Sequence, residues 1–408
     1  MLTPEYLYRI TEGAEDIASQ LHTNIMQKII ERMMIRIGRG EEYLLTATDR
    51  WQIEVLQDAG YLLEDIQKEI SDKTKKQIKE IRESMEDAGV QALQWDDKIY
   101  RAAGLSPVPL LQSPTLMRLM QRNYEATAGE WRNFTRTTAS EAQRLFINQM
   151  DNAYNMVTSG AVSYTEAVRD VINSVSDTGV KVSYPSGHKL SIEAATMMIV
   201  RTGISQVASD VSIARMEEMD WDIILVSAHL GARSGDGGMN PGNHLWWQGQ
   251  FYSRTGRTKE YPDFKTATGY GTGEGLCGWN CRHSFGPGDG INNPFSEKDI
   301  AYADNYKIEK LQQRQRTLER RIRDSKRKVQ NLQTAVDNCK DEKLKFELQQ
   351  QLDKKAYKLK RQNKEYQQYC KDNDLKEYSE RLKVAKWDRQ QAAKAAGAAR
   401  RYQNARGD

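Results

Sequence analysis

The spacing of apolar side chains constrains the fold of this chain more than any other feature. From Leu7 to Ile29, apolar residues recur at intervals of three and four, and similar stripes continue to about residue 176. Because an α-helix has about 3.6 residues per turn, this spacing gathers apolar side chains on one helical face. The sequence therefore predicts amphipathic helices throughout residues 1–177.

Local signals set the expected ends of these helices. Thr3 followed by Pro4 fits an N-cap with proline in the first turn, and Gly38 is expected to end the helix that follows. The two prolines of SPVP at 106–109 end a second helical stretch. Further helices are expected at about 113–127, 139–158 and 163–176.

Residues 297–408 combine helical spacing with positive charge. They hold 30 Lys and Arg against 18 Asp and Glu, a net charge of +12, whereas the whole chain carries +4. Two heptad stripes, separated by a plausible turn at 337–342, predict an antiparallel helical hairpin, followed by a third helix whose Ala- and Arg-rich end is expected to fray. The stripes consist of Ile308, Leu311, Leu318, Ile322, Val329, Leu332, Val336 and Cys339, and then of Leu344, Leu348, Leu352, Leu359 and Tyr366.

The centre of the chain has a different texture. Alternating apolar residues around a Pro-Ser-Gly turn at 185–187 predict a short hairpin, and a helix is expected from Ser191 to about Met219. The β-branched run WDIILVSA at 221–228 predicts a strand. Residues 229–293 then hold 15 of the 28 glycines and three of the five histidines, which indicates a compact, site-like region rather than a long loop.

These patterns predict a mostly α protein with a small α+β module. Its expected parts are a helical N-terminal domain at 1–177, an α+β module with a compact Gly/Trp/His/Cys-rich centre at 178–296, and a basic, coiled-coil-like helical arm at 297–408. A body with net charge −8 then carries the +12 arm. Such an arm can contact nucleic acid, an acidic protein surface, or water alone.

Composition narrows the class of protein. The chain is 28% charged with a mean hydropathy of −0.76, and no apolar run reaches the roughly 18 residues that a membrane span requires. No secretory leader is visible at the N-terminus. Four cysteines in 408 residues do not make a disulfide framework, so a reducing compartment is expected.

Three kinds of chemistry are open to the segment 227–287. Cys277, Cys281 and His283 form a C-x3-C-x-H pattern that can bind zinc, with His244 or His229 as a fourth ligand, although a packed, metal-free cluster is also consistent with it. A cysteine near histidines can also serve as a nucleophile. The glycines of YGTGEGLCG can cradle a phosphate, but no strand or helix is expected at the flanks that such a loop needs.

The same segment resembles a known family. SAHLGAR at 227–233, H-x-x-WQG from residue 244 and GYGTGEGLCGWNCRHSFGP at 269–287 look like the phage minor capsid protein 2 family, which is related to the Mu F-type head morphogenesis proteins. Motifs such as SGAVSYTEAV at 159–168 and YPSGHKLSIE at 184–193 follow the family in the same order. The resemblance covers roughly residues 1–330, although GDGGMNPGN between Arg233 and His244 is longer than the family pattern leads us to expect.

The family pattern falls on a set of central residues, which the resemblance implies to be a structural or binding centre. These residues are His229, Arg233, His244, Trp247, Gln248, Gly249, Gly275, Cys277, Gly278, Asn280, Cys281, Arg282 and His283. The resemblance implies a virion component made in the host cytoplasm, placed inside the capsid near the portal, and active in head assembly, DNA packaging or ejection. The resemblance implies no enzymatic activity and no cofactor. Zinc remains an alternative only because of the C-x3-C-x-H pattern.

Two further expectations concern partners. Besides the portal and other capsid proteins, packaged DNA is a candidate partner of the arm, through the basic residues Arg320, Arg321, Arg323, Lys326, Arg327 and Lys328. The competing hypothesis is an enzyme or toxin-like effector centred on residues 220–290 and delivered with the genome. The heptad pattern after residue 297 speaks against a fused toxin domain.

Overall fold

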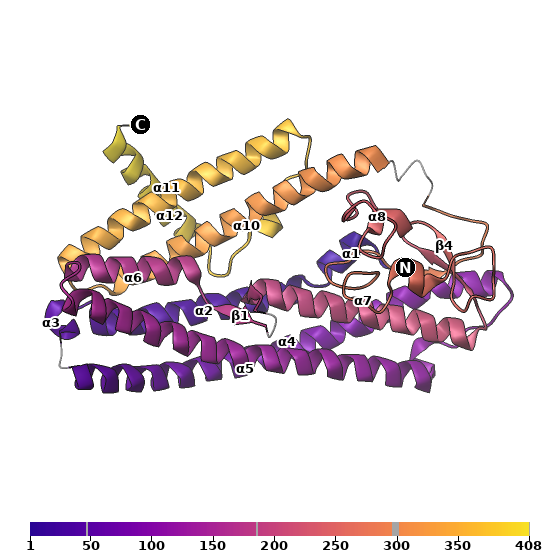
Figure 1. The fold of residues 1–408 in the computed structure, drawn as a ribbon, viewed down its shortest axis with the longest axis horizontal. Coiled ribbons are helices and arrows are strands. Elements are labelled where there is room, and N and C mark those ends of the chain that lie inside the picture. The colour runs from indigo at the N-terminus through magenta and orange to yellow at the C-terminus, as the bar shows by residue number, and fades with distance from the viewer. Residues whose placement is uncertain (46–47, 185–186, 296–301, 408) are drawn as a thin grey trace. The chain divides into compact units, whose positions relative to one another are not determined.

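The computed structural model describes residues 1–45, 48–184, 187–295 and 302–407 (Figure 1). Most of these residues are helical, and the strands form only two small antiparallel sheets, so the predicted mostly α fold with a small α+β module is confirmed. The α-helices are α1 (Pro4–Arg9), α2 (Glu12–Ile37), α3 (Glu41–Leu44), α4 (Thr48–Ala102), α5 (Pro114–Thr158), α6 (Tyr164–Thr178), α7 (Ile192–Glu218), α8 (His244–Trp247), α9 (Phe264–Thr268), α10 (Tyr302–Asn338), α11 (Glu342–Asp372) and α12 (Arg389–Arg406). The strands are β1 (Lys181–Ser183), β2 (Lys189–Ser191), β3 (Ile223–Val226), β4 (Phe251–Ser253) and β5 (Phe285–Pro287).

The residues group into two compact units, each assembled from three separate segments. Unit 1 contains Met1–Glu15, Lys76–Arg132 and Thr196–Gln313, and unit 2 contains Asp16–Lys75, Asn133–Ala195 and Arg314–Asp408. All the boundaries between these segments fall inside long helices, namely α2, α4, α5, α7 and α10. The sequence-based domain limits remain a prediction, and the limit at 296–297 lies outside the described residues.

The expected helical hairpin lies in unit 2. Helices α10 and α11 are joined by a turn at 339–341, and Arg314 on α10 donates to Glu365 on α11 at 2.9 Å, as an antiparallel pair requires. The stripe residues from Leu318 to Tyr366 that the heptads singled out are buried. Helix α12 packs on α11 and extends to Arg406, so the expected fraying is wrong for residues up to that point (Figure 1).

The arm also packs on other parts of unit 2, which differs from the expectation of a free-standing arm. The backbone N–H groups of Lys340 and Asp341 donate to the carbonyl of Gly38 at 2.9 and 3.1 Å, and Ala385 N–H donates to Ser19 Oγ at 3.1 Å. The apolar heptad seam covers only one narrow face of each helix. The polar residues beside it form ion pairs with other segments of unit 2. The arm is therefore part of a larger core.

Two helix boundaries also differ from the sequence-based ones. The helices expected at 113–127 and 139–158 form the single helix α5, since Trp131 is fully buried on its apolar face and no proline interrupts it. In contrast, the first expected helix is broken between Arg9 and Glu12, where Thr11 Oγ1 donates to the Tyr8 carbonyl at 2.9 Å. A hydroxyl that bonds the preceding turn competes with the helical ladder.

The predicted hairpin and strand of the centre are confirmed. Strands β1 and β2 pair antiparallel in unit 2, although the predicted turn residues Pro185 and Ser186 lie outside the described part of the chain. In unit 1, β3 is the middle of a three-stranded antiparallel sheet in the order β4-β3-β5. An apolar core that includes Ile224, Trp247 and Phe264 packs against this sheet.

Candidate functional site: a buried histidine–cysteine cluster

The pairing of the small sheet brings three distant segments to one place. Strand β3 pairs antiparallel with both β4 and β5, with Leu225 opposite Phe251 and Val226 opposite Phe285. In antiparallel pairs the end of one strand lies beside the start of the other. The residues after β3, before β4 and before β5 therefore meet at one end of the sheet. These residues carry His229, His244 and His283.

The three histidines form a compact group. The rings of His229 and His283 stack with centroids 4.3 Å apart, and those of His244 and His283 meet edge-on at 5.3 Å. Gln248 orders the group, because its Oε1 accepts from the backbone N–H of His229 at 3.1 Å and lies 2.8 Å from His283 Nε2. An amide oxygen only accepts, so His283 carries its proton on Nε2 and presents a lone pair at Nδ1.

Arg233 and His244 meet despite the long insertion between them. Arg233 Nη2 lies 2.6 Å from His244 Nε2 and donates to the Glu274 carbonyl at 2.8 Å. Burial, helped by the neighbouring Arg233 and His229, lowers the pKa of His244 to about 4, although the hydrogen bond to the Glu274 carbonyl acts in the opposite direction. His244 is thus neutral near pH 7. Burial also holds the pKa of His283 well below its usual range.

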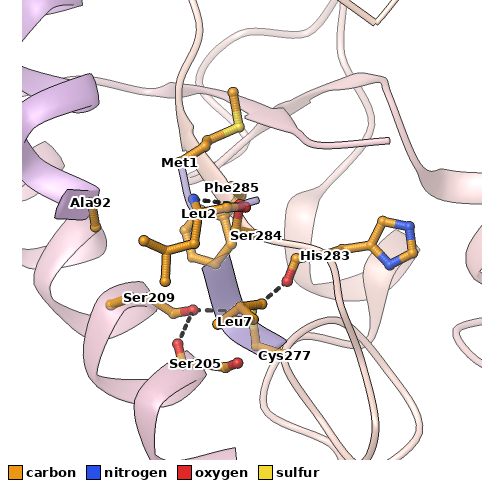
Figure 2. Close-up of a pocket in the computed structure, with 11 residues that line it drawn as sticks. Met1, Leu2, Leu7, Ala92, Ser205, Ser209, Cys277, His283, Ser284 and Phe285 are labelled. Carbon is orange, nitrogen blue, oxygen red and sulfur yellow. Dashed lines mark hydrogen bonds between the residues drawn. The ribbon is translucent and has the colours of Figure 1, made fainter. Parts of the chain in front are cut away.

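The two cysteines face different surroundings. Cys281 Sγ lies 3.7 Å from His283 Nδ1, whereas Cys277 Sγ lies 3.0 Å from Ser209 Oγ and donates to the His283 carbonyl at 3.7 Å. Figure 2 shows Cys277 on the side of a small cavity, with the ring of His283 directed away from it. This cavity has room for about one water molecule, at roughly 10 Å³.

Thiol chemistry at the cluster is suppressed by burial. Both Cys277 and Cys281 are buried, and burial raises the pKa of each thiol above its ordinary value. The thiolate, which is the nucleophilic form, is therefore scarce at neutral pH in the structure as it stands.

Glycines and turns shape the CGWNC loop. A side chain on Gly275 would place Cβ 2.2 Å from the Gly269 carbonyl oxygen, and one on Gly278 would place it 2.5 Å from that of Gly273. Gly249 adopts a φ of +66° in the link to β4, and Cys277 and Asn280 also have positive φ values, of 60° and 57°. Gly275 and Gly278 therefore allow close backbone packing, and Gly249 allows a positive φ.

The remaining predicted residues surround the cluster. The indole of Trp247 is fully buried, lies 4.9 Å from the His283 ring and donates from Nε1 to the Pro241 carbonyl at 3.0 Å. Asn280 is exposed and Arg282 half-buried at its edge. The structure thus brings His229, Arg233, His244, Gln248, Cys281 and His283 together, whereas Cys277 contacts the His283 carbonyl and Ser209 rather than the His283 ring.

The start of α10 supports the site, which the sequence did not indicate. Asn305 is fully buried, and its Oδ1 accepts from the N–H groups of Gly231 and Ala232 at 2.8 and 3.0 Å. Glu309 Oε2 accepts from the Ser234 hydroxyl at 2.7 Å. These contacts hold the loop that carries His229 and Arg233. No local pattern in the sequence marked Asn305 or Glu309, because helix α10 carries other acidic residues and asparagines as well.

The six basic arm residues differ in their surroundings. Arg320 and Arg321 are exposed, but Arg327 pairs with buried Glu193 at 2.7 Å, and Lys328 pairs with Asp177 at 3.4 Å. Arg323 donates to the Arg381 carbonyl and Lys326 to the Leu382 carbonyl. Four of the six thus contribute to packing within unit 2.

Long helices with a small, buried His/Cys centre define a mostly helical protein. Comparison with known proteins then gives its family. The model of the family described as phage minor capsid protein 2 matches residues 2–372. The chain therefore belongs to the phage minor capsid protein 2 family and is a bacteriophage capsid component.

A relative and the solved structures complete the comparison. The chain is 24% identical over 328 residues to a "Structural protein" of Lactococcus phage LL-H, an alignment that covers 73% of this chain and 83% of that protein. No solved structure matches. Across the described residues, no helix combines the length and apolar character that a membrane span needs.

Proposed function

We propose that this capsid component lies inside the phage head near the portal and acts in head assembly, DNA packaging or ejection by binding rather than by catalysis. The proposal rests on the observation that the His/Cys centre is buried. Its thiols are buried and protonated, and the adjacent cavity holds about one water molecule. Cys281 and His283, the thiol–imidazole pair of the centre, are 2% and 1% exposed, so a substrate cannot reach them in this arrangement of the loops.

The same observation separates this proposal from the effector hypothesis. An enzyme or toxin centred on residues 220–290 needs an accessible reacting group and room for a substrate. The centre instead resembles a core that fixes the surrounding loops in place. In this proposal, the exposed faces of the long helices bind other capsid proteins and the portal.

Part of this binding is assigned to packaged DNA. Arg320 and Arg321 are adjacent, exposed and on the +12 segment, and Arg320 contacts only the Thr317 hydroxyl within the same helix among the interactions described, so both can approach phosphate groups. Arg327 and Lys328 are already paired with carboxylates and are not proposed as DNA ligands.

Purified virions test the location. Quantitative mass spectrometry of particles is expected to find this protein at a small fraction of the copy number of the major capsid protein, and cross-linking is expected to join it to the portal. Protease should leave it intact in closed particles and digest it once the capsid is opened, with an exposed tail protein as the control. Its absence from particles, or its digestion in intact ones, would contradict the proposal.

A further inference from the structure

Three potential metal ligands meet inside unit 1. One ligand atom each from His244, Cys281 and His283 lies within 4.8 Å of the other two, and all three side chains are buried. Imidazole nitrogen and thiolate sulfur are the ligands that Zn²⁺ prefers, usually in tetrahedral geometry. We propose that His244, Cys281 and His283 bind one zinc ion, whose fourth position is open to a water molecule.

The spacing within the cluster fits such a site. Zinc binds sulfur at about 2.3 Å and imidazole nitrogen at about 2.0 Å, so two tetrahedral ligands of these kinds lie roughly 3.5 Å apart. Cys281 Sγ and His283 Nδ1 are already 3.7 Å apart. The ligand atoms of His244, Cys281 and His283 lie within 4.8 Å of one another, so His244 has to move closer to complete the geometry. The site is thus nearly formed before the ion enters.

Gln248 orients one of the ligands in advance. Gln248 Oε1 accepts hydrogen bonds from His283 Nε2 at 2.8 Å and from the His229 backbone N–H at 3.1 Å. Metal-binding histidines commonly donate their second ring N–H to an oxygen in this way, which fixes the tautomer and directs the other nitrogen at the ion. Here the nitrogen left available is Nδ1, the one that lies beside Cys281.

A second feature independently points to a missing group. Gln248 is 2% exposed, and its Nε2 has no hydrogen-bond acceptor among the described residues. A buried donor without an acceptor costs about 1–3 kcal/mol, so such a group requires an explanation. This unpaired nitrogen belongs to the amide that holds His283 Nε2, so it is part of the same buried polar cluster as the proposed ligands.

Arg233 and Arg282 lie near the cluster, so a bound cation needs the negative charge of a Cys281 thiolate. Burial raises the pKa of the Cys281 thiol, while Arg233 lowers it. A bound zinc ion would complete the deprotonation, since thiols release their proton when they bind metal. The thiolate then offsets part of the charge of the ion next to Arg233.

Cys277 provides a matched control for the assignment. Cys277 is 4% exposed and Cys281 is 2% exposed. Cys277, however, contacts Ser209 and faces the cavity rather than the His283 ring (Figure 2). Replacing either thiol by a hydroxyl disturbs a buried position of the same loop. Only the Cys281 replacement removes a proposed ligand.

The experiment uses the full-length protein, stripped of metal by a chelator under reducing conditions and then incubated with Zn²⁺ or Co²⁺. The wild-type protein is expected to retain about one equivalent of zinc after desalting. Cys277→Ser should retain the same amount, and Cys281→Ser should retain close to none. The Co²⁺ form should show the strong visible bands of a tetrahedral ion and one thiolate-to-cobalt charge-transfer band.

Three results would overturn the proposal. One is a wild-type protein that binds neither ion. The second is a Co²⁺ complex without a thiolate band, and the third is a folded Cys281→Ser protein that binds as much zinc as wild type. Because the spectrum is recorded on the wild-type chain, it decides the matter even if Cys281→Ser fails to fold.

Discussion

At the scale of single residues, Glu193 in unit 2 is a buried carboxylate with two basic partners. Its carboxylate lies 2.9 Å from His22 Nδ1 and 2.7 Å from Arg327 Nη2, and it is 5% exposed. Burial alone would raise the pKa of Glu193, but Arg327 and His22 hold it below the ordinary value of 4.5. The stabilisation is therefore present above about pH 4.5 and is lost as the pH falls toward the lowered value.

Removing one partner of this group should be costly. Arg327→Ala leaves a buried carboxylate without its guanidinium, and we expect the free energy of unfolding to fall by about 3 kcal/mol. Arg321→Ala on the same helix removes an exposed charge and should change it by less than about 0.5 kcal/mol. Urea denaturation of the full-length variants measures both. Equal effects would mean that Arg327 is not engaged as described.

At the scale of elements, the continuity of α5 through residues 128–138 is the clearest departure from the sequence-based expectation. Gly129 lies within this helix, and a Cβ added there would meet nothing within 4 Å. Gly203 on α7 differs, since a Cβ there would lie 2.6 Å from Thr127 Oγ1 and 2.8 Å from Met85 Cε. One glycine is tolerated by the helix and the other is required by close packing.

The two glycines should therefore respond to alanine with opposite signs. Gly129→Ala should stabilise the protein by about 0.5–1 kcal/mol, because alanine has the higher helix propensity and fits. Gly203→Ala should destabilise it by about 1–3 kcal/mol through overpacking. Thermal melting of both variants beside wild type checks the signs. A destabilising Gly129→Ala would indicate that the backbone near residue 129 is not helical.

At the scale of the whole molecule, charge is divided unequally along the chain. Residues 297–408 carry +12 and the remainder −8. Because the arm residues pack with other segments of unit 2, cutting the chain at 297 would expose a core and confuse folding with binding. Charge variants of the intact chain are the appropriate probe of DNA contact.

We expect Arg320→Gln/Arg321→Gln to weaken binding to duplex DNA and to reduce the slope of log affinity against log salt by about 2, since each phosphate contact contributes nearly one unit. Wild-type binding should fall steeply between about 50 and 200 mM salt without sequence preference. Arg118→Gln/Arg122→Gln, two exposed residues on α5, is the matched control. Equal losses in both double variants would reject a DNA surface on the arm.

Local patterns determined most of the secondary structure. Thr3 caps α1 as expected, the turn at 339–341 separates α10 from α11, and the run at 221–228 contains β3. These features depend on backbone capping, helical period and β-branched side chains within a few residues, so neighbouring residues suffice to predict them. The cysteines and histidines were also identifiable as a group, from their density in residues 229–293.

Only the tertiary structure decided which of these residues meet. It joined Cys281 with His244 and His283, placed Cys277 against Ser209, and used Asn305 of α10 to hold the loop that carries His229. It likewise turned Arg327 from a candidate DNA ligand into a partner of Glu193. The physical reason is that antiparallel strand pairing and helix packing bring together residues that lie tens to hundreds of positions apart, and no local periodicity records those distances.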